Sequence, residues 1–154
     1  MKFIIIGMDA WNGTLQEMAE KEGLSDRLMF LPPVPSEKLP EITVDADMGF
    51  ILFRNTCLNH YYSLPNKLYE YMMAGIPVIA SGFPELKAVI EQTGCGITVD
   101  PESPAQIFSA VKELSENPAA RQRMSDAGRK AAMKQYNWEP QRNRLTGLYR
   151  EIME

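Results

Sequence analysis

The chain has 154 residues, of which 45% are hydrophobic and 23% are charged, and its formal net charge is −4 with a pI of about 5.1. This balance indicates a globular protein long enough to bury a substantial core. The acidic surplus argues against nucleic acid as a partner, because a phosphate backbone requires a basic surface. The sequence predicts neither a membrane span nor a signal peptide. We therefore expect one cytoplasmic domain over residues 1–154.

The few cysteine and histidine residues limit the metal chemistry. Cys57 and Cys95 lie far apart and lack the spacing of metal-binding or redox pairs. His60 is the only histidine, which excludes a histidine-rich metal site. We expect reduced thiols, no metal ion and no bound cofactor.

Short, unbroken apolar runs alternate with helical stripes along the chain. Such runs are typical of strands buried on both faces of a parallel sheet, and they lie at residues 3–7, 28–31, 48–53, 77–80 and 96–99. The segments between them predict helices at about 12–22, 36–46, 64–74 and 84–92, with Asn12 and Ser36 as helix caps. Only helices follow the last strand, at about 104–116, 118–135 and 138–153.

This succession predicts the α/β class. We expect a three-layer Rossmann-like domain: a mostly parallel sheet of about five strands with right-handed crossovers, helices on both faces, and a helical C-terminal tail. In such a sheet, ligands bind beyond the carboxyl ends of the strands. The connection after the third strand, Arg54 to Tyr62, is long and polar, which favours a functional loop over a mere linker.

Residues 63–81 are the most informative stretch, because they read as a helix start, two helical turns, a glycine stop and a buried strand. Ser63 is the expected cap, Pro65 lies in the first turn, and Gly75 is suited to the left-handed position that ends a helix. On this helix Asn66, Lys67 and Glu70 fall on one face.

A helix start with this composition is suited to binding a phosphate beside a polyol. Free backbone donors and the helix dipole attract anions, Lys67 adds a cation, and Glu70 one turn on accepts hydrogen bonds from hydroxyls. Those two requirements together describe a nucleotide or a nucleotide-sugar. The alternative is that the same polar residues are the solvated face of an amphipathic helix.

The stretch 63–81 resembles the donor-site signature of the group 1 family of GT-B glycosyltransferases. The resemblance extends along nearly the whole chain and includes residues 4–7, 24–31, 39–47, 84–90, 94–99 and 136–138. It implies that the chain is one half of a GT-B fold, the C-terminal donor-binding domain, without the N-terminal acceptor domain.

The resemblance also implies roles for single residues. Glu70 matches the glutamate that binds the donor ribose hydroxyls, and Leu64 and Pro65 match the turn whose backbone approaches the diphosphate. Asn66 and Lys67 are expected to add side-chain contacts at that turn. Ser63, at the start of the stretch, and Arg54, in the loop after the third strand, are further expected donor-site residues by their position alone. Pro33 and Val34 align with the loop whose main chain reads the nucleobase. No catalytic residue is identified in this half.

One position departs from the family pattern. A second glutamate, which normally contacts the donor sugar, would fall at position 62, where this chain has Tyr62. The identity of the sugar therefore stays open.

For the complete enzyme, the resemblance implies hexosyl transfer from a UDP- or GDP-sugar to an acceptor, with no metal, in a pathway such as polysaccharide biosynthesis. Contact with the inner face of a membrane would come only through the absent half. The isolated chain would bind nucleotide weakly without turnover, and Met1 would be the start of a fragment of a longer enzyme.

The family's opening strand has no counterpart in this sequence. We therefore expect the strand order 2-1-3-4-5, in which the strand at 3–7 pairs with the one at 48–53. The alternative is that a second copy of the chain fills the gap, which would give a swapped or packed homodimer.

Two other function classes share this sequence pattern. A nucleotide-sugar epimerase-like domain would have the same fold but would need acidic and basic catalytic residues in this half, and none is evident. A non-catalytic nucleotide-binding or assembly module would have the same pattern without any catalysis. Titration with UDP, GDP and ADP would discriminate between these classes.

Overall fold

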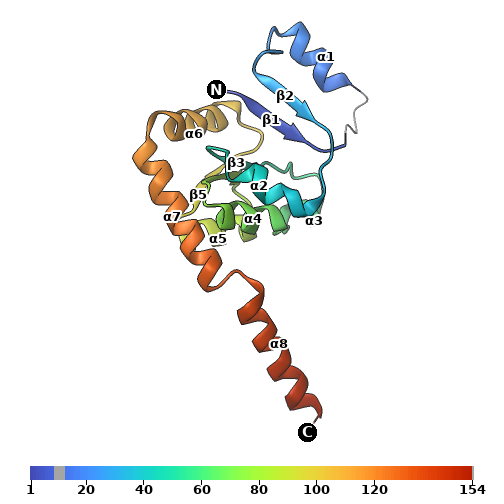
Figure 1. Cartoon of the computed structure of the whole chain (residues 1–154). Helices are drawn as coiled ribbons and strands as arrows, with labels where there is room; N and C mark the ends of the chain where they lie inside the picture. Colours follow the sequence, from blue (N-terminus) through green and yellow to red (C-terminus); the bar gives the residue numbers. More distant parts are fainter. Residues whose placement is uncertain (9–12, 154) are drawn as a thin grey trace. The chain divides into compact units, whose positions relative to one another are not determined.

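The computed structural model describes residues 1–8 and 13–153 (Figure 1). The expected cap Asn12 lies outside the described residues. By its internal contacts the chain divides into two compact units, residues 1–41 and the residues from Ile42 onward. All the predicted strands occur, and the helices fall close to their expected positions.

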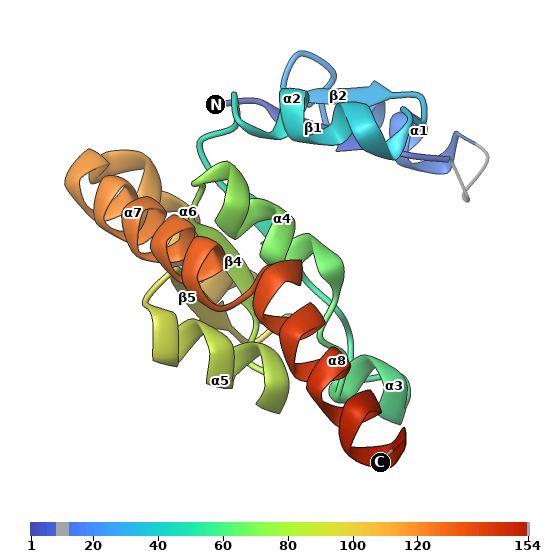
Figure 2. The ribbon, with the colours of Figure 1, turned by 60° about the horizontal axis from the view of Figure 1, so that its bottom comes forward.

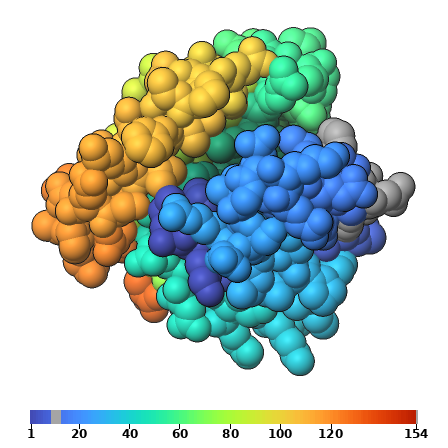
Figure 3. All heavy atoms as spheres, turned by 90° about the horizontal axis from the view of Figure 1, so that it is seen from above, coloured from blue at the N-terminus to red at the C-terminus, as the bar shows by residue number. Residues whose placement is uncertain are grey.

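The first unit contains a pair of parallel strands connected by a helix. Strand β1 (Phe3–Ile6) pairs with β2 (Leu28–Leu31) along its whole length, and helix α1 (Thr14–Lys21) lies between them in the chain. The short helices η1 (Ser36–Lys38) and α2 (Leu39–Thr43) follow. Figure 3 shows the surface of α1 and the segment after it, drawn in blue. Among residues 1–8 and 13–41, Ala19 is the only buried residue.

The second unit is built on a three-stranded parallel sheet. Its strands are β3 (Gly49–Ile51), β4 (Val78–Ser81) and β5 (Gly96–Val99), in the order β3-β4-β5. All four residues of the central strand β4 are buried. This explains why its sequence is an unbroken apolar run rather than an alternating one.

Helices cover both faces of this sheet, as predicted. On one face Val78 and Ala80 of β4 join the cluster formed with α4 (Asn66–Ala74) and α5 (Pro84–Thr93). On the other face Ile79 packs against α6 (Pro104–Glu116). Helix α7 (Pro118–Lys134) runs beside α4 (Figure 2).

The α/β class with parallel strands and helices on both faces is confirmed, but the prediction that one sheet of about five strands holds them all, in the order 2-1-3-4-5, is wrong. The described residues form one sheet of two strands and another of three, and no strand pairing joins β1 to β3. The apolar side chains Ile4 and Ile5 of β1 are 54% and 43% exposed. An apolar run indicates that a strand is suited to burial, but it carries no information about which strand lies next to it.

Two of the expected helix caps are also wrong. Helix α4 is preceded by Pro65 in an extended conformation (φ −75°, ψ 150°) and has no side-chain cap, so Ser63 lies too far upstream to act as one. Similarly, Pro35 rather than Ser36 precedes η1, again without a side-chain cap. The expected glycine stop is confirmed, because Gly75 adopts the left-handed conformation with φ 72°.

The last helix, α8 (Trp138–Met153), has no buried residue. Asn137 connects it to α7: its side-chain amide donates to the carbonyl oxygens of Ala132 and Met133, and its Oδ1 accepts from the backbone N–H of Glu139.

No helix in the described part of the chain combines the length and the apolar character needed to cross a bilayer.

Candidate functional site

The start of α4 presents an unpartnered polar face. Asn66, Lys67 and Glu70 are exposed, and within the described residues their side chains form no hydrogen bond or ion pair. The first backbone N–H bonded within this turn is that of Leu68, which donates to Pro65 O at 3.1 Å. The N–H groups of Asn66 and Lys67 therefore stay available at the positive end of the helix dipole.

Packing beneath this face fixes α4 on the sheet. Tyr71 lies against Gly49 of β3, where an added Cβ would come within 2.5 Å of the tyrosine ring. Burial, and then the neighbouring Glu70 carboxylate, raise the pKa of Tyr71. Only glycine at position 49 lets the ring approach the strand this closely, so α4 packs tightly on β3 beneath its exposed face.

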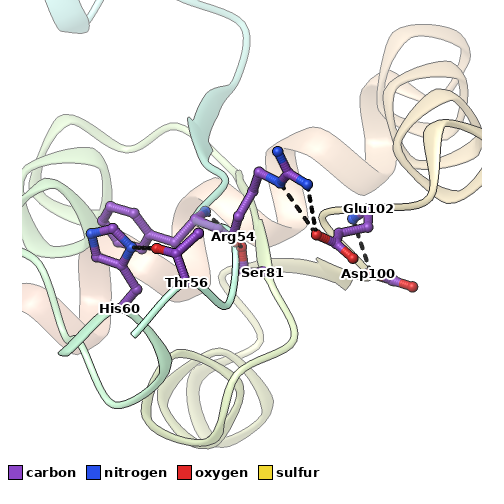
Figure 4. A network of polar contacts seen from close by, with 7 residues as sticks. Arg54, Thr56, His60, Ser81, Asp100 and Glu102 are labelled. Carbon is purple, nitrogen blue, oxygen red and sulfur yellow. Dashed lines mark hydrogen bonds and ion pairs between the residues drawn. The ribbon is translucent and has the colours of Figure 1, made fainter. Parts of the chain in front are cut away.

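The connection after β3 is anchored by one buried hydroxyl (Figure 4). Ser81 Oγ accepts from the backbone N–H of Phe53 at 2.8 Å and donates to the carbonyl oxygen of Phe53 at 2.8 Å. The ring of His60 stacks on that of Phe53, and His60 Nδ1 lies 2.8 Å from Thr56 Oγ1. This stretch was expected to be a loop, but Leu58–Tyr61 forms a short helix, α3.

Arg54, which follows Phe53, forms an ion pair with Glu102 in the connection after β5. Its Nε and Nη2 both donate to Glu102 Oε1, at 3.2 and 3.1 Å. Glu102 is held in turn by its backbone N–H, which donates to Asp100 Oδ1. Because both partners of the Arg54–Glu102 pair are largely exposed, the pair contributes about 0–1 kcal/mol and is easily exchanged.

Most of the predicted site residues gather at one edge of the second unit. Ser63, Leu64 and Pro65 are half-buried and lead directly into the exposed face of α4. Arg54 leaves the carboxyl end of β3, the same end of the sheet from which the chain enters α4.

The two residues expected near the nucleobase belong to the first unit. Pro33 is exposed and Val34 is half-buried, in the segment between β2 and η1. Their role stays a prediction.

Tyr62, which stands at the position of the family's other glutamate, is 56% exposed. It directly follows α3, and its ring meets that of Tyr61 edge-on at 4.9 Å. The family pattern has a glutamate at this position, whereas this chain has an exposed aromatic side chain.

Ser81 and Glu102 contact Phe53 and Arg54, but the sequence assigned neither of them a role in the site. A polar residue at the end of an apolar strand, such as Ser81, is a signal that could have been used to find it. The partner of Glu102 is 48 residues away in the chain, so only the folded structure shows that contact. In the described residues no three histidine, cysteine, aspartate or glutamate side chains gather in a way that would hold a metal ion.

Sequence comparison relates the chain to sugar transferases. A family model for group 1 glycosyl transferases matches residues 1–131. The D-inositol 3-phosphate glycosyltransferase of Corynebacterium urealyticum is 29% identical over 138 residues, which are 90% of this chain. The chain spans 31% of the length of that relative.

Two solved structures share the fold of this chain. Sucrose-phosphate synthase from Thermosynechococcus elongatus superposes with a TM-score of 0.84 at 21% identity, over 97% of this chain and 38% of that one. The Anabaena protein HepE, solved in complex with UDP-glucose, superposes with a TM-score of 0.80 at 14% identity, over 97% of this chain and 41% of that one.

Proposed function

Because the chain belongs to the group 1 glycosyltransferase family, we propose that it is the donor-binding domain of a GT-B enzyme that transfers a hexosyl group from a UDP- or GDP-sugar. The observation that carries the proposal is the exposed face of α4. Asn66, Lys67 and Glu70 stand there without internal partners, beside free backbone N–H groups. Unpaired polar groups on a closely packed helix are suited to a ligand.

The chemistry of this face fits a nucleoside diphosphate. The helix start and Lys67 would stabilise the negative charge that grows on the diphosphate as it leaves the sugar. Glu70 lies one turn further along α4, where its carboxylate would accept hydrogen bonds from the ribose hydroxyls. The UDP-glucose complex of the HepE protein supports a nucleotide-sugar as the class of donor.

The chain would supply half of a complete enzyme. It spans 31% of the first relative and 38–41% of the two structural neighbours, so an acceptor domain would come from the rest of a longer protein. We therefore expect this chain to bind the donor nucleotide without transferring sugar.

Calorimetric titration with UDP, GDP and ADP tests the proposal. We expect binding of UDP or GDP, and a loss of about tenfold in affinity in Glu70→Ala, the size typical of a lost hydrogen bond to a charged group. The loss should shrink for the 2′-deoxy nucleotide, which lacks one of the hydroxyls that Glu70 would bind. Glu113→Ala, an exposed glutamate on α6, is the matched control and should leave affinity unchanged.

Three outcomes would contradict the proposal or a part of it. Failure of all three nucleotides to bind at millimolar concentration would favour an assembly module that binds no nucleotide. Binding that Glu70→Ala leaves unchanged would remove the ribose role, and epimerisation of a bound nucleotide-sugar would indicate the other enzyme class.

A further inference from the structure

Ser81 places a hydroxyl where the packing alone would favour an apolar side chain. It is 0% exposed, ends the buried strand β4, and is the one buried polar side chain among the described residues. A buried hydroxyl is costly unless it is hydrogen-bonded. The hydrogen-bond partners of Ser81 therefore show which part of the structure its hydroxyl stabilises.

Both close partners are backbone groups of Phe53. The paired register of β3 and β4 ends at Ile51 and Ala80, so Phe53 already lies beyond the ladder. Ser81 Oγ takes the place of a neighbouring strand there, accepting from the N–H and donating to the C=O of Phe53, both at 2.8 Å. The side chain thus fixes the direction in which the chain leaves β3.

Arg54 follows directly, so the position of its Cα depends on this anchor. In the structure its guanidinium rests on Glu102 in an exposed pair. Exposed pairs of this kind are weak, and a diphosphate carries more negative charge than one carboxylate, so the guanidinium would exchange Glu102 for the ligand.

We propose that Ser81 is a positioning residue of the donor site, which acts through the backbone of Phe53 to hold Arg54 within reach of the donor diphosphate. This role rests on the proposed function. Ser81 would thus affect the affinity for the diphosphate although its buried side chain does not contact the ligand.

A double-mutant cycle tests the role. Ser81→Ala, Arg54→Ala and the double variant are titrated with UDP or GDP, whichever the unaltered chain binds. We expect Ser81→Ala to weaken binding by about tenfold, and we expect no further loss when it is added to Arg54→Ala, because coupled residues are not additive. Ser81→Thr keeps the hydroxyl and should restore binding.

A matched control separates positioning from general destabilisation. Ile79→Val trims a buried side chain of the same strand without touching Phe53, and it should leave nucleotide affinity unchanged. Amide hydrogen exchange provides a readout without nucleotide: the Phe53 amide should exchange faster in Ser81→Ala but not in Ile79→Val.

The outcomes distinguish this role from the proposed function. Unchanged affinity in Ser81→Ala, or losses that add fully in the double variant, would overturn the role of Ser81 while donor binding stands. If the unaltered chain binds no nucleotide, the proposed function fails and the role falls with it, whatever the exchange of the Phe53 amide shows.

Discussion

Tyr71 connects the packing of the site to its chemistry. Its ring fills the space that Gly49 leaves on β3, while the negative charge of Glu70 acts on its ionisation. Burial first, and this negative charge second, raise the pKa of Tyr71 above the ordinary value of 10.0. The residue is therefore held in its neutral form under the exposed face of α4.

This shift predicts a loss of stability in alkali. Because the folded pKa of Tyr71 is higher than the unfolded one, the unfolded chain loses its proton first. Stability is complete below about pH 10 and falls as the pH rises through the folded pKa. Tyr71→Phe keeps the ring on Gly49 but cannot ionise, so it should lose less stability than the unaltered chain.

Urea unfolding at about pH 8 and about pH 11 measures this difference. Tyr149→Phe, on the exposed surface of α8, is the control and should behave like the unaltered chain. Tyr69 has a raised pKa as well, again mainly from burial, so Tyr71→Phe should remove only part of the alkaline loss. An equal alkaline loss in Tyr71→Phe and in the unaltered chain would contradict the assignment.

At the scale of single elements, close approach of backbones fixes the three-stranded sheet. A Cβ on Gly96 of β5 would clash with the carbonyl oxygen of Val78 in β4, a backbone atom that cannot move aside without disturbing the pairing of the two strands. Gly147 in α8 is the opposite case, since nothing lies within 4 Å of a Cβ placed there.

We therefore expect opposite effects of the same substitution at these two glycines. Gly96→Ala should lower the free energy of unfolding by about 3 kcal/mol, the upper part of the range for overpacked sites. Gly147→Ala should favour α8 by about 0.5–1 kcal/mol, because alanine is the better helix former. Urea unfolding and far-ultraviolet circular dichroism measure both effects, and a Gly96→Ala protein as stable as the unaltered chain would contradict the close packing.

Helix positions followed well from the sequence, whereas two of the expected capping residues were wrong. Apolar periodicity and Gly75 predicted α4 and its end, because both signals are local. Ser63 was wrong as a cap because Pro65 keeps the chain extended up to the first helical residue. Helix α3 was missed because one helical turn is too short to show a periodic pattern.

At the scale of the whole molecule, the sequence indicated the parallel strands but not how they divide into sheets. Pairing partners depend on contacts between distant segments, and apolar runs of four residues look alike whichever neighbour they have. In the candidate site, too, local features could be predicted from the sequence but contacts between distant segments could not. The exposed face of α4 could be predicted from local spacing, while the tie between Arg54 and Glu102 joins two connections that no local pattern relates.

The two units also differ in how much apolar surface they bury, and this predicts a difference in local stability. Among residues 1–8 and 13–41 only Ala19 is buried, whereas every residue of β4 is buried in the second unit. Burial is the main source of stability, and regions with few buried contacts open without global unfolding. The amides of β1 and β2 should therefore exchange with deuterium faster than those of β4. Hydrogen exchange followed by mass spectrometry compares the three strands in one sample, so equal protection would show that residues 1–41 unfold only together with the second unit.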